Sequence, residues 1–261
     1  MFNNCSSKTN GELRFYSLIK ENINIIFDIG CKTESEFLNF VGEVHYFDPV
    51  EKFVKELSQK SNNNILPFFN NFGLGNNNEK LDYYPSIDSF NKRTTSLPGR
   101  NYDEGKLKLE IRKGSDYVKE KNIKMIDFLK IDTEGFEFDV LKGFEEQIKN
   151  VKIIQFEYGG CYLDNNVKLN DIIKYLQNYG FHKFSYLHPN GKTDFESLKG
   201  EICQTNPGHR NGKWSFLSYP ETVQYMDENG FIPDHYNYCN IVCINKNCHL
   251  YLQPEWSRRE K

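Results

Sequence analysis

The sequence predicts an α/β fold: a doubly wound, mostly parallel seven-stranded sheet, formed as one domain over residues 1–261. Three observations predict it. Short apolar runs alternate with amphipathic stretches along most of the chain, as they do in successive βα units. Several of these runs are apolar on both faces, as buried parallel strands are. Aromatic residues make up 15% of the chain, which provides a core although only 38% of residues are apolar.

The first part of the chain alternates between the two kinds of element. The expected helices are Glu12–Lys20, Ser35–Phe40 and Glu51–Lys60, and the expected strands are Ile23–Ile29, Val44–Phe47 and Ile65–Phe69. The Asn- and Gly-rich stretch Asn70–Asn78 is expected to be the exit loop of the third strand. Two further strands, Leu81–Tyr84 and Leu107–Ile111, are expected on either side of a polar loop.

The second part continues the pattern. The expected strands are Met125–Ile131, Val151–Phe156, Phe184–Leu187 and Asn237–Ile244, and the expected helices are Asp116–Glu120, Phe136–Ile148, Leu169–Asn178 and Glu221–Asn229. We interpret residues 23–187 as the core, 189–235 as a loop-rich insertion and 237–261 as the last strand and tail. The insertion is too short to hold much core of its own, so no second domain is expected.

Composition excludes several classes of protein. A net charge of −3 argues against a nucleic-acid partner, because such domains usually carry a basic face. No stretch approaches about eighteen apolar residues, and the polar N-terminal segment lacks the apolar core of a signal peptide. The chain has no alanine and much asparagine, which is typical of an AT-rich source such as a low-GC bacterium or a large DNA virus. We expect a cytoplasmic protein whose seven cysteines are mostly free thiols.

Acidic residues end four of the expected strands. They are Asp28 in FDIG, Asp48 in YFDP, Asp132 in KIDTEG and Glu157 in QFEYGG. The carboxyl ends of parallel strands meet at one edge, where ligands bind. Any one of these acids could serve only as a helix cap, but four at one edge favour a ligand site. Asp48 follows Asp28 by 20 residues, the separation typical of a nucleoside-binding βαβ unit.

The first loop, Asp28–Ser35, indicates the kind of ligand. It contains one glycine, Gly30, and the chain has neither a GxGxxG cradle nor a GKS or GKT motif, which disfavours dinucleotides and nucleoside triphosphates. An acid before the glycine instead suits a cationic or amino-acid-bearing ligand. S-adenosylmethionine, which has both a sulfonium and an ammonium group, is a ligand of this kind.

The ordered motifs FDIG, YFDPVEKFVKEL, NNFGLG, IDFLKIDTEGFEFDVLKGFEE and IIQFEYG resemble those of FkbM-type S-adenosylmethionine-dependent methyltransferases. The most specific part is LKIDTEGFEFDVLKG, within Phe128–Gly143. The resemblance spans about residues 23–187 and implies the Rossmann-like fold of class I methyltransferases. It also implies methylation of a hydroxyl group, most often on a sugar of a glycan or on a natural product. Glu34 stands where the family's first loop usually has a second glycine.

The resemblance also assigns roles to single residues. It implies that Asp28 and Gly30 form the cofactor loop, that Asp48 binds the ribose, and that Asp132 lies closest to the transferred methyl group. The remaining implied cofactor contacts, at the adenine, are Pro49, Asn71 and Phe72. If the strand persists beyond Ile131, its alternation would also place Lys130, Asp132 and Glu134 on one side. Lys130 could be catalytic or could only pair with a neighbouring carboxylate.

A hydroxyl acceptor benefits from a general base. The candidate bases are Asp132, Glu157 and His209, the last of which comes from the insertion and could equally be a surface histidine. The insertion also holds groups that suit carbohydrate, namely Asn206, Arg210, Asn211, Trp214 and Tyr219. We therefore expect a sugar or glycan acceptor and place the insertion on the acceptor side. A plain surface loop remains the alternative.

Other functions stay open. Asp132, Glu134 and Glu157 could bind a divalent ion, but the resemblance does not require a metal and none is expected. Cys239, Cys243, Cys248 and His249 fall in and after an apolar strand, which favours core cysteines over a zinc site. A cofactor- or glycan-binding protein without catalysis is the main alternative, motivated by Glu34, and methylation of a non-sugar molecule is another. The sequence leaves the oligomeric state open.

Overall fold

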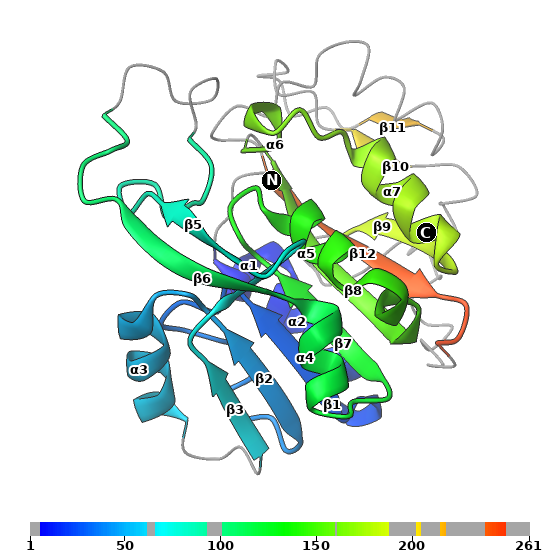
Figure 1. The fold of residues 1–261 in the computed structure, drawn as a ribbon. Helices are drawn as coiled ribbons and strands as arrows, with labels where there is room; N and C mark the ends of the chain where they lie inside the picture. The colour runs from blue at the N-terminus through cyan, green and yellow to red at the C-terminus, as the bar shows by residue number, and fades with distance from the viewer. Residues whose placement is uncertain are drawn as a thin grey trace.

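A computed structural model of the protein describes residues 6–61, 66–92, 101–159, 161–187, 202–204, 215–217 and 238–248. At its centre is a seven-stranded sheet in the order β3-β2-β1-β7-β8-β12-β9 (Figure 1). Neighbours β3, β2, β1, β7 and β8 pair in parallel, and β12 runs antiparallel between β8 and β9. This confirms the doubly wound, mostly parallel seven-stranded sheet that the sequence predicts.

The strands of this sheet are β1 (Ile25–Ile29), β2 (Glu43–Phe47), β3 (Leu66–Asn70), β7 (Ile126–Ile131), β8 (Val151–Gly159), β9 (Phe181–Tyr186) and β12 (Tyr238–Asn245). The helices are α1 (Ser7–Asn10), α2 (Glu12–Ile19), α3 (Glu51–Lys60), α4 (Gly114–Glu120), α5 (Glu137–Gly143), α6 (Cys161–Asp164) and α7 (Leu169–Asn178), with 3-10 turns η1 (Lys20–Asn22) and η2 (Glu145–Asn150). A second sheet has the order β4-β6-β5, formed by β4 (Gly73–Gly75), β6 (Leu107–Lys113) and β5 (Glu79–Tyr83). The short strands β10 (Ile202–Gln204) and β11 (Ser215–Leu217) pair antiparallel.

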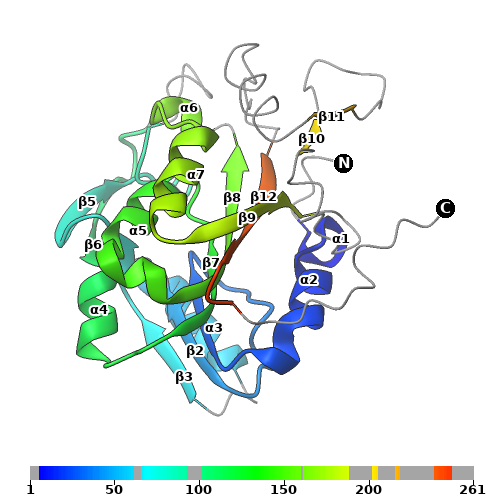
Figure 2. The same ribbon diagram turned by 90° about the vertical axis from the view of Figure 1, so that its right-hand side faces the viewer.

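Two layers of helices cover the two faces of the large sheet. Neighbouring residues of β1 point to opposite faces, so Ile26 packs with residues of α2 and α3 while Phe27 packs with residues of α4, α5 and α7. Figure 2 shows α2 on one side of the sheet and α4, α5 and α7 on the other. Burying an apolar side chain of this size contributes roughly 1.5–3 kcal/mol, which explains why the strands are apolar on both faces.

Two helices have the predicted bounds because their apolar residues recur at helical spacing. In α3, Val54 and Leu57 are buried, and in α7 the buried residues are Leu169, Ile172, Ile173 and Leu176. The spacing i, i+3, i+4, i+7 places all four residues of α7 on one stripe. This stripe packs on the sheet.

Three predictions of local structure are wrong. Ser35–Phe40 forms turns in place of a helix, because the Ser35 hydroxyl accepts a hydrogen bond from the Phe37 amide and donates one to Asp28. The helix expected over 136–148 ends at Gly143 and resumes as η2, since Glu145 has a left-handed φ of 50°. The exit loop expected over Asn70–Asn78 contains β4, which pairs with β6.

Some predictions fall on parts of the chain that the structure does not describe. The helix at Glu221–Asn229, the candidate base His209 and most of the insertion over 189–235 lie outside the described residues. The single-domain organisation therefore stays a prediction. Cys243 is fully buried in β12, in agreement with its assignment to the core. Within the described ranges, no helix is long and apolar enough to cross a membrane.

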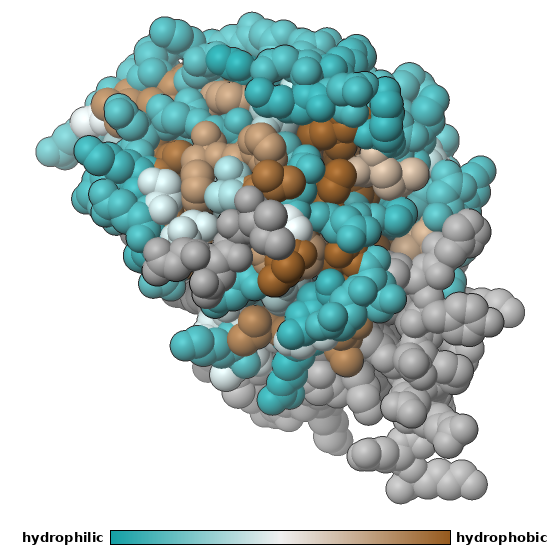
Figure 3. Space-filling model, turned by 90° about the horizontal axis from the view of Figure 1, so that it is seen from below, coloured by the Kyte–Doolittle hydropathy of each residue, from teal (hydrophilic) through white to brown (hydrophobic). Residues whose placement is uncertain are grey.

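The two ends of the large sheet differ in character. The β8 arrowhead points to the upper end of the molecule (Figure 2), so the carboxyl edge lies there. The lower end, seen from below in Figure 3, shows apolar surface gathered near the middle of a hydrophilic rim. The chemistry-bearing acids lie at the carboxyl edge.

Candidate active site

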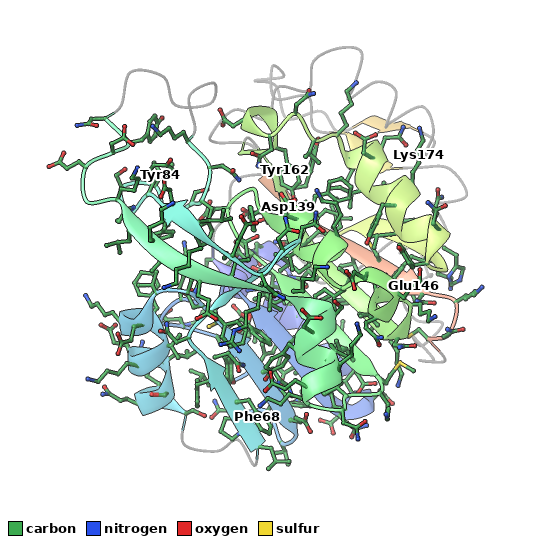
Figure 4. All side chains as sticks on the ribbon, viewed as in Figure 1. Phe68, Tyr84, Asp139, Glu146, Tyr162 and Lys174 are labelled. Atoms are coloured by element: carbon green, nitrogen blue, oxygen red, sulfur yellow. The ribbon has the colours of Figure 1, made fainter. Side chains whose placement is uncertain are left out.

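The site lies where the chain reverses its direction across the sheet. Strands β1, β2 and β3 follow one another to one side, and β7 and β8 then continue from β1 to the other side. In such sheets, ligands bind at this switch point, outside the carboxyl ends of the strands. Asp28 lies opposite Lys130 in the β1–β7 register. Figure 4 labels Tyr84 and Tyr162 near this upper end and Phe68 near the lower one.

Gly30 brings the loops after β1 and β7 into close contact. Its φ is +81°, and a Cβ atom there would lie 1.9 Å from the carbonyl oxygen of Asp132. The amide of Gly30 donates to the carbonyl of Phe47 at 2.9 Å, and the amide of Asp132 donates to the carbonyl of Ile29 at 2.9 Å. Only glycine combines this conformation with this approach, so the sequence position of Gly30 is explained.

Asp28 is buried with one oxygen unmatched. Its side chain is 1% exposed, and its Oδ2 accepts a hydrogen bond from the Ser35 hydroxyl. Its Oδ1 has no hydrogen-bond partner among the described residues. Burial raises the pKa of Asp28 to about 7, against the opposing charge of Lys130. A buried, unmatched carboxylate oxygen is costly in itself and fits a cationic donor from a ligand.

Asp48 holds the first loop against the second strand. Its Oδ1 accepts from the amide of Val50 at 2.9 Å, and its Oδ2 accepts from the amide of Lys32 at 3.1 Å. Burial raises its pKa to about 6. Each carboxylate oxygen has two acceptor positions, so these contacts leave room for two ribose hydroxyls.

The implied adenine contacts divide into two kinds. The Asn71 carboxamide donates to the carbonyls of Pro49 at 3.2 Å and Asp48 at 3.4 Å. The ring of Phe72 is buried, packs against Phe47 and Tyr117, and lies under the Arg112 guanidinium at 4.2 Å. An adenine contact from Phe72 would therefore have to use its backbone, and the contact stays a prediction.

Asp132 follows β7 and faces several charges. Burial raises its pKa to about 6, and the charge of Lys130 opposes that rise. Glu157, near the end of β8, has a pKa raised well above its usual range by burial and by the charge of Asp132. The side chains of Asp132 and Glu157 thus share one site, as the sequence predicts. Glu134 does not continue the strand: β7 ends at Ile131, and Glu134 has a left-handed φ of 56°.

Lys130 is held by carboxylates that sequence reasoning missed. Its side chain is 12% exposed, and its ammonium lies 3.3 Å from Glu36 and 3.6 Å from Glu12. Glu12 belongs to α2 and also accepts a hydrogen bond from Gln155 at 2.8 Å. Of the two roles considered for Lys130, the structure supports pairing. No sequence signal links Glu12 to a site more than a hundred residues away.

Glu137 shapes the turn after β7 and was also missed. Its Oε1 accepts from the amides of Thr133 at 2.8 Å and Gly135 at 3.2 Å. Burial raises its pKa to about 7. Its position in the sequence, two residues after the glycine of the DTEG segment, could have indicated this role. Within the described ranges, no group of three or more His, Cys, Asp or Glu side chains has the arrangement of a metal site.

The model of the FkbM methyltransferase domain matches residues 28–183, more than half of the chain. The chain belongs to the FkbM methyltransferase family. It is therefore an S-adenosylmethionine-dependent methyltransferase, as predicted. A curated relative, the 2-O-methyltransferase NoeI of Sinorhizobium fredii, is 21% identical over 182 residues, which cover 62% of this chain and 75% of that protein.

Solved structures similar to this FkbM methyltransferase include two methyltransferases. One is a TehB-like S-adenosylmethionine-dependent enzyme from Corynebacterium glutamicum, with a TM-score of 0.41, 8% identity and coverage of 90% of this chain and 88% of the other. The other is an rRNA methylase from Streptococcus thermophilus, with a TM-score of 0.40, 8% identity and coverage of 88% and 93%.

The carboxyl edge of this FkbM methyltransferase fits a cationic cofactor. Among the described residues, carboxylates outnumber ammonium groups there: the interacting acids are Glu12, Asp28, Glu36, Asp48, Asp88, Asp132, Glu134, Glu137 and Glu157, and the cations are Lys32 and Lys130. A sulfonium and an ammonium group would offset part of this excess. The unmatched Oδ1 of Asp28 supplies an acceptor for the ammonium group.

Glu34, where the chain departs from the family's usual first loop, has an exposed side chain. Its side chain is 89% exposed, and its carboxylate is 4.0 Å from the Lys60 ammonium. Glu34 does not have a positive φ, so its backbone conformation does not require a glycine. The loop takes a course that leaves the Glu34 side chain in solvent.

Proposed function

We propose that this methyltransferase moves the methyl group of S-adenosylmethionine to a hydroxyl oxygen of a sugar or glycan. The observation that carries the proposal is Asp132, a half-buried carboxylate at the switch point whose pKa of about 6 keeps it largely ionised near neutral pH. An ionised carboxylate at this position can act as a general base for a weakly acidic hydroxyl. The name of the relative NoeI, a 2-O-methyltransferase, supports an oxygen acceptor.

Each residue of the site would have a defined task. Asp28 would accept a hydrogen bond from the ammonium group of the cofactor through Oδ1, and Asp48 would bind its ribose hydroxyls. Pro49 and Asn71 would border the adenine. When bound, the cofactor supplies an activated methyl group on a sulfonium. Holding the acceptor in line with that methyl group accounts for much of the rate in such displacements.

Asp132 would take the proton of the acceptor. As the hydroxyl oxygen bonds to the methyl carbon, the carbon–sulfur bond breaks, and the proton goes to the Asp132 carboxylate. Glu157 is the second candidate for the base, and its raised pKa makes it the weaker one near neutral pH because more of it is protonated. His209 is the third candidate and lies outside the described residues. We place the insertion over 189–235 on the acceptor side.

The test is transfer of labelled methyl groups to a set of small acceptors. The full-length protein would be incubated with methyl-labelled S-adenosylmethionine and methyl glycosides of neutral hexoses, 6-deoxyhexoses and N-acetylhexosamines, beside phenols and simple secondary alcohols. We expect alkali-stable label on at least one glycoside, because methyl ethers survive alkali and methyl esters do not. Label on the non-sugar alcohols alone would overturn the sugar assignment. Tight binding of S-adenosylhomocysteine without any transfer would favour the non-catalytic alternative.

A further inference from the structure

Three loops meet at the ammonium group of Lys32. Its Nζ lies 3.2 Å from Glu134 Oε1 and 3.2 Å from Asp88 Oδ2. Lys32 follows β1, Asp88 follows β5 and Glu134 follows β7, so the three residues come from distant parts of the chain. We call these three residues the Lys32 clamp. The Ser89 hydroxyl adds a hydrogen bond to the carbonyl of Glu134 at 3.1 Å.

The backbone of the clamp is strained. Lys32, Asp88 and Glu134 have φ values of 47°, 51° and 56°, in the left-handed region that residues with a Cβ atom seldom adopt. They are three of the six non-glycine residues with such values in the described chain. Strain of this kind persists where the surrounding structure fixes it, and it gathers at functional sites. Three strained residues meeting at one ammonium group, through two ion pairs, therefore indicate more than a surface salt bridge.

The clamp joins the loop over residues 84–91 to the turn after β7. The loop over residues 84–91 begins at Tyr84, whose amide bonds to the carbonyl of Ser89 at 2.9 Å. Phe90 packs on Phe136 at 5.5 Å between ring centroids, beside the turn that begins at Asp132. The Nδ2 atom of Asn91 is buried and has no hydrogen-bond partner among the described residues. An unmatched amide donor at this place suits a ligand that carries hydroxyl groups.

We propose that Lys32 is a positioning residue for methyl transfer: by joining Glu134 to Asp88, its ammonium group fixes the turn that carries Asp132 against the loop over 84–91, which forms one wall of the acceptor pocket. The inference rests on the proposed function. It deepens that function, because it places part of the acceptor pocket on the β5–β6 connection in addition to the later insertion.

Lys32 also acts on the charge of the candidate base. Among the described residues, Lys130, Glu134, Glu12, Lys32, Asp28 and Glu157 interact electrostatically with Asp132. Of these six groups, the two lysines stabilise its ionised form. Lys130 is buried among Glu12 and Glu36, whereas the Lys32 side chain is 41% exposed and can be substituted with less damage to the core. Loss of the Lys32 charge therefore raises the pKa of Asp132.

The first experiment measures backbone order in the full-length protein with S-adenosylhomocysteine present. Hydrogen exchange followed by mass spectrometry would compare wild type, Lys32→Met, Lys32→Arg and the control Lys52→Met, which removes an exposed lysine paired with Glu56 on α3. We expect Lys32→Met to speed exchange about tenfold in both segments, 83–92 and 131–137, and Lys32→Arg to restore most of the protection. The control should match wild type. Faster exchange in one segment alone, or in neither, would overturn the clamp.

The second experiment separates positioning from simple structural support. With any glycoside that is methylated, Lys32→Met should raise the acceptor KM at least fivefold, leave the cofactor KM within about twofold, and move the acid limb of the kcat profile to higher pH. An unchanged acceptor KM together with an unchanged pH profile would overturn the positioning role. If no glycoside is methylated, the proposed function fails, and the exchange data still decide whether the clamp exists.

Discussion

Two buried ionisable clusters of this protein differ in how completely their charges and hydrogen bonds are matched. In the interior of β2, His45 Nε2 lies 2.6 Å from Glu43 Oε1, and Nδ1 lies 2.7 Å from the Tyr117 hydroxyl. The imidazole also stacks on Phe68 at 4.5 Å. Both ring nitrogens are thus satisfied, and the cluster is closed.

The carboxyl edge is different because, among the described residues, its acids outnumber its cations. Asp28 keeps an oxygen without a partner among the described residues, and Asp132 and Glu157 repel each other. Burial shifts the pKa values in both clusters, so a shifted pKa alone does not identify a site. An unmatched buried charge does, because folding gains nothing from it and a ligand can complete it.

Removal of the Asp132 charge should reduce turnover more than any other substitution proposed here. Asp132→Asn keeps the shape of the side chain and removes its charge, so kcat should fall about 10²–10⁴-fold. Affinity for S-adenosylhomocysteine, measured by calorimetry, should stay within a few-fold. Asp139→Asn is the control, since Asp139 pairs with Lys142 on the surface of α5. If Asp132→Asn keeps wild-type turnover, Asp132 has a structural role, and Glu157 or His209 becomes the candidate general base.

Gly30 tests whether the close approach of two loops builds the edge. Gly30→Ala places a Cβ atom 1.9 Å from the Asp132 carbonyl oxygen in a left-handed conformation. The free energy of unfolding should fall by about 2–5 kcal/mol, with loss of cofactor binding. Gly105 is a matched control, because its φ is +69° and no atom lies within 4 Å of its added Cβ. Gly105→Ala should cost only about 1–2 kcal/mol, and equal losses would mean that steric contact at Gly30 is unimportant.

Removal of the Asp28 charge should stabilise the fold, because this charge is buried and incompletely matched. Its pKa is raised by burial to about 7, so the stability it contributes is present at low pH and is lost as the pH rises through 7. At pH 8, Asp28→Asn should therefore raise the free energy of unfolding by about 1–3 kcal/mol while weakening cofactor binding at least tenfold.

The control for Asp28 is a buried aspartate with matched partners. Asp127 Oδ2 accepts from the amides of Asn24 and Ile25, and Oδ1 lies 2.6 Å from the Lys152 ammonium. Asp127→Asn should destabilise the protein in the same denaturation experiment. If both substitutions destabilise it equally, the charge of Asp28 is as well matched as that of Asp127.

The sequence predicts elements that have a regular apolar pattern better than elements that form only through pairing. Acids at strand ends were predictable because a short run that is apolar on both faces locates a buried strand; Asp28 lies in the last residues of its strand, and Asp48 and Asp132 follow theirs directly. α3 and α7 were predictable because their apolar stripes are regular. β4 was not, because Gly73–Gly75 has no strand pattern of its own and becomes a strand only by pairing with β6.

The rest of the candidate site depends on contacts between distant segments. Glu12 meets Lys130, and Lys32 meets Asp88, only after the sheet has brought their loops together. The turns at 35–40 also depend on contacts with distant residues. Helical spacing predicts a helix there, but Ser35 bonds to Asp28, and Phe37 and Phe40 pack against Tyr16. Tertiary contacts override local propensity at these positions.

In the closed cluster, titration of His45 should change the free energy of unfolding only slightly. The change with pH should be opposite in sign to the one expected for Asp28. Burial lowers the pKa of His45, and the nearby Glu43 carboxylate opposes this. The folded state therefore prefers neutral His45, while the unfolded chain takes up a proton below about pH 6.5. The contribution of His45 to the free energy of unfolding is therefore complete above that pH and is lost as the pH falls.

His45→Phe tests this sign directly. The variant should be less stable than wild type at pH 7.5, because Glu43 and the Tyr117 hydroxyl lose their partner. The difference in free energy of unfolding between the two proteins should narrow by about 1 kcal/mol between pH 7.5 and pH 5. Only wild type has a histidine at this position, and folding lowers its pKa, so only wild type loses stability there as the pH falls. Urea denaturation at a series of pH values would measure it, with His182→Phe, an exposed histidine on β9, as the control for loss of a histidine. A constant gap would mean that Glu43 accommodates the imidazolium, and the closed cluster would then tolerate charge as the carboxyl edge does.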